Sequence, residues 1–135
     1  QQVYHEAVIT GLQRGYPDAV QLQAFLVGHH WPTLSPVVVK ADLASERLGK
    51  GEVQAIAIAQ ARALPLLIDD SDARSVADKR GIITYGTLGI LAQAFRKAYV
   101  TASELDELLT AIENRADIWI QPGLCQRLRN SLLKI

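Results

Sequence analysis

This sequence is poor in cysteine and methionine, and neither basic nor acidic residues are in excess. Its 135 residues include one cysteine and no methionine, and 14 basic residues balance 14 acidic ones. A single cysteine excludes the disulfide framework that stabilises many small secreted domains. A formal net charge of zero excludes a protein that holds nucleic acid through an overall basic excess, so any such binding must depend on a local patch.

Long apolar runs are also missing, although 49% of the residues are hydrophobic. No stretch approaches the roughly 18 uninterrupted apolar residues of a membrane span, and no signal-peptide pattern opens the chain. We therefore expect a cytoplasmic, soluble protein that forms one domain over residues 1–135 and has no membrane partner. Cys125 is predicted to be a core or semi-buried residue rather than a nucleophile. Trp31 and Trp119 are predicted to be core or interface residues.

Strand and helix patterns alternate through the middle of the chain. Leu66-Leu67-Ile68 is typical of a buried parallel strand, and Ile82-Ile83-Thr84 predicts a second strand. β-Branched residues predict an edge strand over residues 34–39, and residues 52–59 are apolar around most of a helical circumference, which favours a helix packed on a sheet. This alternation predicts an α/β fold whose parallel sheet is covered by helices.

Start and stop signals predict further helices. Pro17 suits the first turn of a helix that ends near Gly28. One face of this helix carries three large apolar residues, Leu22, Phe25 and Leu26. Thr101-Ala102-Ser103-Glu104 is a capping box and predicts the start of another helix. A last helix is expected from about residue 122 to residue 132.

Two adjacent acids, Asp69 and Asp70, directly follow the apolar run of residues 66–68. Residues just past the carboxyl end of a parallel strand lie where α/β proteins bind ligands. Adjacent carboxylates repel each other unless a cation, hydrogen-bond donors or water compensates, so a hard metal ion is one hypothesis. The alternative is that Asp70 is the N-cap of the next helix, which accounts for only one of the two acids.

Two further acids, Glu6 and Glu52, lie at the edge or end of predicted helices. Glu6 flanks the apolar stripe of the first helix, and Glu52 opens the apolar helix. Carboxylates that converge from separate elements suit Mg²⁺ or Mn²⁺, because these ions prefer oxygen ligands. Taken singly, Glu6 is explained as an ordinary charge on a helix face, and Glu52 as a first-turn acid that stabilises the helix dipole.

Four segments together resemble a known family. They are Val3-Tyr4-His5-Glu6-Ala7-Val8, Gly51-Glu52-Val53-Gln54-Ala55-Ile56-Ala57, Leu67-Ile68-Asp69-Asp70 with Ala73-Arg74, and Gly86-Thr87-Leu88-Gly89. Their order and spacing over residues 3–110 resemble a PIN-domain subfamily, the PilT N-terminus and VapC-related predicted nucleic-acid-binding proteins. The resemblance implies a three-layer α/β/α sandwich with a central parallel sheet, and acids gathered at the carboxyl ends of the strands around one or two divalent ions.

Carried over by position, the resemblance implies roles for particular residues. Glu6, Glu52 and Asp69 would be catalytic and would bind Mg²⁺ or Mn²⁺, with Asp70 either a further ligand or the cap. Thr87 matches a polar position near the site, where its hydroxyl would hold a metal-bound water. Arg74 lies beside the site and either meets an RNA backbone or belongs to a solvated helix face, which is the commoner role for such a basic residue.

The function implied is that of a metal-dependent endoribonuclease that hydrolyses RNA phosphodiester bonds, as the toxin of a toxin–antitoxin pair. Its partners would be RNA, a protein antitoxin and a second copy in a homodimer.

The family's first strand, which carries another acid, has no counterpart after Gln1, so we expect a segment before this residue. That missing strand and the neutral charge motivate an alternative, a non-catalytic PIN-like module that binds a protein or nucleic acid. A third possibility is a phosphate-handling protein of receiver or phosphatase type. Such a protein needs a nucleophilic aspartate and a partnering lysine, and neither can be assigned in this sequence.

Three other motifs are given structural interpretations. His29 and His30 are predicted to lie at a helix end rather than in a metal site, since no third ligand has suitable spacing. Gly86-Thr87-Leu88-Gly89 lacks the lysine of a phosphate-binding loop and predicts a tight turn between strand and helix. Residues 105–112 carry a leucine-rich stripe flanked by acids, which argues against RNA binding there and suits either the core or a dimer contact.

Overall fold

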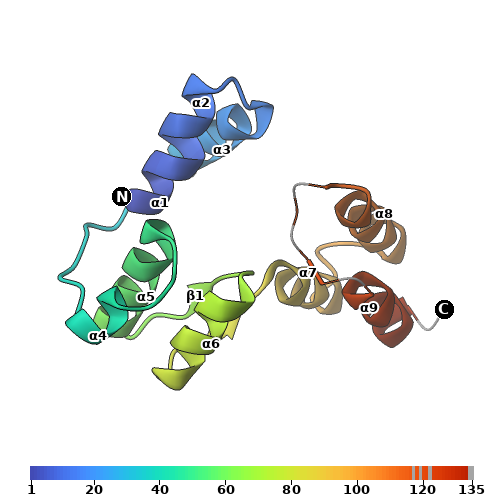
Figure 1. The fold of residues 1–135 in the computed structure, drawn as a ribbon. Coiled ribbons are helices and arrows are strands. Elements are labelled where there is room, and N and C mark those ends of the chain that lie inside the picture. Colours follow the sequence, from blue (N-terminus) through green and yellow to red (C-terminus); the bar gives the residue numbers. More distant parts are fainter. Residues whose placement is uncertain (117, 119, 122, 134–135) are drawn as a thin grey trace.

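The computed structural model describes residues 1–116, 118, 120–121 and 123–133. In Figure 1 a helical hairpin, a central α/β part and a group of three helices follow one another along the chain. The elements are α1 (Gln2–Tyr4), the π-helix η1 (His5–Thr10), α2 (Gly11–Gln13), α3 (Pro17–Gly28), α4 (Ala41–Ala44), α5 (Lys50–Arg62), β1 (Leu66–Leu67), α6 (Ser71–Lys79), β2 (Thr84–Tyr85), α7 (Thr87–Arg96), α8 (Ala102–Glu113) and α9 (Leu124–Leu133).

The two strands form a parallel pair at the centre of the chain. Leu66 lies opposite Thr84, and Leu67 lies opposite Tyr85. The backbone N–H of Ile68 donates to the carbonyl oxygen of Tyr85 at 2.8 Å. Helix α6 forms the crossover that parallel strands require. The predicted α/β fold with a parallel sheet is confirmed, and β2 starts at Thr84, the last residue of the predicted strand. The expected burial of the strand at residues 66–68 is wrong for Leu67, which is 65% exposed, because β1 packs on the core through Leu66 on its other face.

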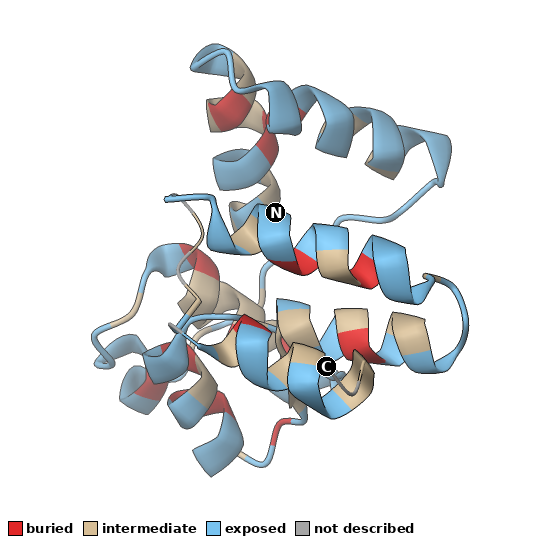
Figure 2. Cartoon of the chain, turned by 90° about the vertical axis from the view of Figure 1, so that its right-hand side faces the viewer, coloured by how far each residue is buried: buried red, intermediate tan, exposed pale blue. Residues whose placement is uncertain are grey.

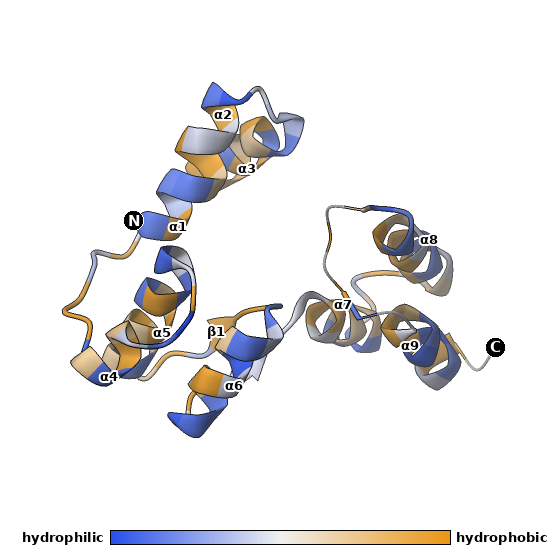
Figure 3. Ribbon diagram, viewed as in Figure 1, coloured by the Kyte–Doolittle hydropathy of each residue, from blue (hydrophilic) through white to orange (hydrophobic). Residues whose placement is uncertain are grey.

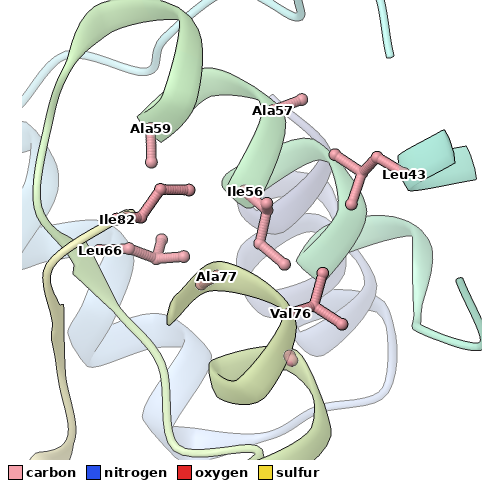
Figure 4. Close-up of a cluster of buried hydrophobic side chains, with 9 residues drawn as sticks. Leu43, Ile56, Ala57, Ala59, Leu66, Val76, Ala77 and Ile82 are labelled. Carbon is pink, nitrogen blue, oxygen red and sulfur yellow. The ribbon is translucent and has the colours of Figure 1, made fainter. Parts of the chain in front are cut away.

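A cluster of buried residues joins this sheet to the helices around it. Ile56 of α5 is fully buried, and α6 contributes Val76 and Ala77 (Figure 4). Leu66 of β1 and Leu43 of α4 complete the contacts between elements. The apolar circumference of α5 is thus explained by packing, and the end of β1 is held in place by the core below it.

A second cluster joins α7, α8 and α9, helices whose hydrophobic and hydrophilic residues lie on different sides (Figure 3). Leu105 and Leu109 of α8 are fully buried beside Cys125 of α9, so the leucine-rich stripe and the cysteine belong to the core. Burial raises the pKa of the Cys125 thiol, which disfavours the reactive thiolate. The predictions for Trp119 and Pro122 fall outside the described residues.

Polar contacts define the ends of α8 and attach α9 to it. The predicted capping box is present, since Glu104 accepts a hydrogen bond from the Thr101 backbone N–H at 2.7 Å. Arg129 of α9 donates to the carboxylates of Asp106 and Glu113 on α8, at 2.5 and 2.7 Å. The acids that flank the leucine stripe are therefore partly neutralised by α9.

One further expectation from the sequence is wrong, and another is reduced to one of its two alternatives. Residues 34–39 form no strand, because Pro36 supplies no ladder N–H and no neighbouring strand pairs with this segment in the described part of the chain. Val38 is 94% exposed there. Trp31, expected in the core or at an interface, is 58% exposed and lies outside the core, so its interface role stays a prediction. None of the described helices is long and apolar enough to cross a membrane.

Replacing Ile56 with alanine tests the first core cluster. Ile56→Ala is expected to lower the free energy of unfolding by about 2–5 kcal/mol, because it removes apolar contacts and leaves a cavity. Ile83→Ala makes the same change at a side chain that is 65% exposed, and should stay within about 0.5 kcal/mol of wild type. Urea unfolding monitored by circular dichroism measures both, and equal losses would contradict the assigned core.

An ion pair between α4 and the end of α6 should make stability depend on pH. The Arg80 guanidinium donates to the Asp42 carboxylate at 2.8 Å and holds the pKa of that carboxyl below its usual value. The stabilisation is present above the unfolded-state pKa of about 3.9 and is lost as pH falls through the lower folded-state pKa. Asp42→Asn should therefore unfold at lower urea than wild type near neutral pH, and the difference should shrink in acid. If the difference in urea midpoint between Asp42→Asn and wild type grew at acidic pH, the ion pair would not be the cause of the pH dependence.

Candidate functional site

The Asp69 carboxylate links the end of β1 to the start of α7. Its Oδ1 accepts a hydrogen bond from the Thr87 backbone N–H at 2.8 Å, and its Oδ2 accepts one from the Thr87 hydroxyl at 2.5 Å. The N-cap position of α7 is Gly86, which has no side chain to cap the helix. Asp69 therefore caps the amino end of α7, although it lies 18 positions before Thr87 in the chain. The structure thus brings Asp69 and Thr87 into direct contact.

Arg74 of α6 lies beside this carboxylate. Its Nη2 donates to the carbonyl oxygen of Ile68 at 2.7 Å and lies 4.0 Å from Asp69 Oδ1. Among the described residues, the buried Nε of Arg74 has no hydrogen-bond partner. The side chain is 40% exposed, so this guanidinium both anchors the strand end and presents positive charge to solvent.

Gly86 makes the close approach of these groups possible. A Cβ at this position would overlap Arg74 Nη2 and would lie 2.8 Å from Asp69 Oδ1. Its φ of −105° is open to any residue, so glycine is needed for space rather than for backbone freedom. The sequence pattern correctly predicted a turn here, but nothing in it indicated that two charged side chains press against the glycine.

Asp70 has a separate role. Its Oδ1 accepts hydrogen bonds from the backbone N–H groups of Asp72 and Ala73, at 3.0 and 2.8 Å. These bonds make Asp70 the N-cap of α6. The capping interpretation of Asp70 is confirmed, and the two adjacent acids serve different helices.

Glu6 and Glu52 meet the first turn of α5. Glu52 Oε2 accepts from the Gly49 backbone N–H at 2.7 Å. Glu6 reaches the same helix end from η1, where its Oε2 lies 2.6 Å from the position that a Cβ on Gly51 would occupy. Its Oε1 accepts from the Gln2 side chain at 2.8 Å. The positive end of the α5 dipole favours both carboxylates.

These four acids suit a divalent ion by type, because carboxylate oxygens are the ligands that Mg²⁺ and Mn²⁺ prefer. The geometry, however, divides them among three helix starts: Glu6 and Glu52 lie at the start of α5, Asp70 at the start of α6 and Asp69 at the start of α7. Nowhere in the described ranges do three or more His, Cys, Asp or Glu side chains form a group that could hold a metal ion. A joint ligand set of Glu6, Glu52 and Asp69 remains a prediction, as does any metal bond to Asp70.

Comparison with known proteins identifies the family. The family model DUF3368, described as a PIN domain, matches residues 1–133. This chain belongs to the PIN domain family. PIN domains generally have nuclease-type functions, bind nucleic acid and use divalent metal ions. No curated protein and no solved structure matches the chain.

Adding a methyl group at Gly86 tests the packing around Asp69. Gly86→Ala is expected to push the Arg74 and Asp69 side chains apart and to lower the free energy of unfolding by about 1–3 kcal/mol, as overpacking does. Gly89→Ala, within α7, is the control, since a Cβ there would meet open space. It should leave stability unchanged or raise it by up to about 1 kcal/mol. Equal effects in thermal unfolding would contradict the close approach at Gly86.

Proposed function

We propose that this PIN-domain protein is a divalent-metal-dependent endoribonuclease that hydrolyses RNA phosphodiester bonds, with Asp69 as its central acid. One observation carries this most directly: in a chain that matches the PIN family over residues 1–133, Asp69 follows a parallel strand and its side chain is 45% exposed. Ligands of α/β proteins bind at such strand ends. Mg²⁺ or Mn²⁺ would be held by Asp69 with Glu6 and Glu52, and would supply Lewis-acid stabilisation and an activated water.

The residues around Asp69 have defined tasks in this proposal. The two hydrogen bonds from Thr87 fix the plane of the Asp69 carboxylate, and its oxygens keep further lone pairs for other partners. Arg74 presents a partly exposed guanidinium next to this carboxylate. A guanidinium matches the geometry of phosphate oxygens, so Arg74 is suited to bind and orient the RNA backbone at the site.

A non-catalytic PIN-like module that binds nucleic acid or a protein is the second candidate. It is favoured by the structural hydrogen bonds that already occupy these acids. Asp69 caps α7, Asp70 caps α6, and Glu52 closes the first turn of α5. If these acids have structural roles alone, that would explain why their carboxylates lie at three helix starts rather than at one point.

The biological setting is proposed from the resemblance to VapC-related proteins alone. In this setting the protein is the toxin of a toxin–antitoxin pair, acts in the cytoplasm on RNA, and is bound by a protein antitoxin. Its 135 residues form a single PIN-like domain, and a second copy of the chain is a further partner.

Replacing Asp69 separates the proposed chemistry from the fold. Asp69→Asn is expected to lower Mg²⁺- or Mn²⁺-dependent RNA cleavage by at least about 100-fold, because even outer-shell partners of metal ligands contribute 10–100-fold. Asparagine retains an acceptor for the Thr87 amide, so the fold should persist. Asp70→Ser is the matched control: serine also caps helices, and cleavage should stay near wild type.

Cleavage of labelled single-stranded RNA, with and without the ion, measures these effects, and calorimetric titration with Mn²⁺ measures metal binding. Undiminished cleavage by Asp69→Asn would overturn the role of Asp69, and so would Mn²⁺ binding that ignored the substitution. A wild-type protein that binds RNA but never cuts it would instead support the non-catalytic module.

A further inference from the structure

A cavity of about 360 Å³ lies where the first helices meet α5. Helix α1 packs against α5, and Figure 1 shows it next to one end of that helix. The cavity is lined by aromatic, amide and apolar side chains, which include Tyr4, His5, Ile9, Pro36 and Gln54. Within the described ranges, no Lys, Arg, Asp or Glu side chain lines it. A ligand that forms hydrogen bonds without carrying a charge is therefore better suited to this cavity than an ion.

The π-helix η1 brings side chains five positions apart to this cavity. In a π-helix each backbone N–H bonds to the carbonyl oxygen five residues earlier, so residues five positions apart lie close together. Tyr4, the N-cap of η1, and Ile9 have this spacing, and both line the cavity. Val8 is the buried residue of η1, and Figure 2 shows few buried residues in the helical hairpin. The core therefore leaves the cavity side of η1 free, and π-helical turns are frequent at functional sites.

Gln54 provides a polar group that the fold does not use. Its Oε1 is buried and accepts no hydrogen bond from any described residue. A buried acceptor of this kind costs stability unless a donor reaches it. The last side-chain torsion of glutamine is broad, so rotation about it turns the amide towards the cavity. A ligand that satisfies this amide offers a donor and an acceptor side by side.

The cavity borders one of the acids proposed to bind the metal ion. Gln2 lines the cavity and donates to Glu6 Oε1 at 2.8 Å. Glu6 also approaches Gly51, which lies three positions before Gln54 and therefore on the same side of α5. A ligand in the cavity would thus lie beside a phosphodiester bound near Glu6.

We propose that this cavity binds an unpaired adenine base of the RNA substrate. The inference rests on the proposed nuclease function and adds a base specificity to it. Proteins recognise single-stranded RNA by stacking its bases on aromatic side chains and by bonding to the base edges. The Gln54 amide matches adenine, because its oxygen accepts from the N6 amino group while its NH₂ group donates to N7. Tyr4 and His5 supply aromatic faces for stacking.

Other purines match the Gln54 amide less well. Guanine and hypoxanthine carry an O6 acceptor where adenine carries its amino group. Beside N7, that oxygen leaves Gln54 Oε1 without a donor. Sites that pair a buried polar group with the correct ligand discriminate strongly against analogues that leave the group unpaired. We therefore expect adenine to be preferred over hypoxanthine, although the two bases have the same ring system.

Equilibrium binding of two labelled hexanucleotides tests this preference without cleavage. One contains five uridines and one adenosine, and the other has inosine in place of the adenosine, so phosphate contacts are the same in both. Fluorescence anisotropy with the whole chain, in the presence of EDTA, should show at least about fivefold tighter binding of the adenosine RNA. Gln54→Leu keeps the size of the side chain and should bring the two affinities close together. Gln60→Leu is the matched control, because it makes the same change at an exposed glutamine of α5 outside the cavity.

A change in the RNA alone tests the same contact in the unaltered protein. Adenosine replaced by 7-deazaadenosine lacks the N7 acceptor, and wild type should bind this RNA about threefold or more weakly. Circular dichroism verifies the fold of Gln54→Leu, which should be at least as stable as wild type because it removes an unpaired acceptor. Equal binding of the adenosine and inosine RNAs by wild type would overturn the proposal, and so would a preference that survived Gln54→Leu.

Cleavage assays separate this inference from the proposed nuclease function. With Mn²⁺, wild type should cut next to the adenosine, and Gln54→Leu should cut the adenosine and inosine RNAs alike. Cleavage by a wild type that binds both RNAs equally would overturn the adenine site alone. An adenine preference in binding without any cleavage would overturn the nuclease function and would support the cavity as a base-binding site.

Discussion

Two hydrogen bonds from Thr87 to the Asp69 carboxylate connect the sheet to the helices that follow it. Helix α7 starts at Thr87, and its Leu88 and Leu91 pack in the cluster shared with α8 and α9. Asp69, the residue proposed to act on RNA, therefore also fixes the direction in which α7, α8 and α9 follow β2. Any change that reorients Asp69 acts on both the fold and the chemistry.

Local signals were enough to predict a large part of the structure. The apolar run before Asp69, the start of α3 at Pro17 and the capping box at Thr101 each depend on residues within a few positions of one another. The caps of α6 and α8 are determined at this range, since Asp70 and Thr101 bond to backbone N–H groups two or three positions further on. For the same reason the capping role of Asp70 was among the alternatives read from the sequence.

Contacts between distant segments could not be predicted in this way. The bond from Thr87 to Asp69 spans 18 positions, and the approach of Glu6 to Gly51 joins two helices far apart in the chain. The strand expected over residues 34–39 had the right composition, but a strand also needs a neighbour to pair with. Similarly, the exposure of Trp31 follows from how the hairpin projects, which no local pattern records.

The division of the buried residues into two clusters has a dynamic consequence. Among the described residues, the cluster around Ile56 and the cluster around Leu105 share no member. Separate cores open as separate cooperative units, each with its own free energy. An opening of α7, α8 and α9 would release Thr87, and with it the orientation of Asp69, while β1 and α5 stayed packed. We therefore expect a partly unfolded form in which the sheet is intact and the Asp69 carboxylate is free to turn.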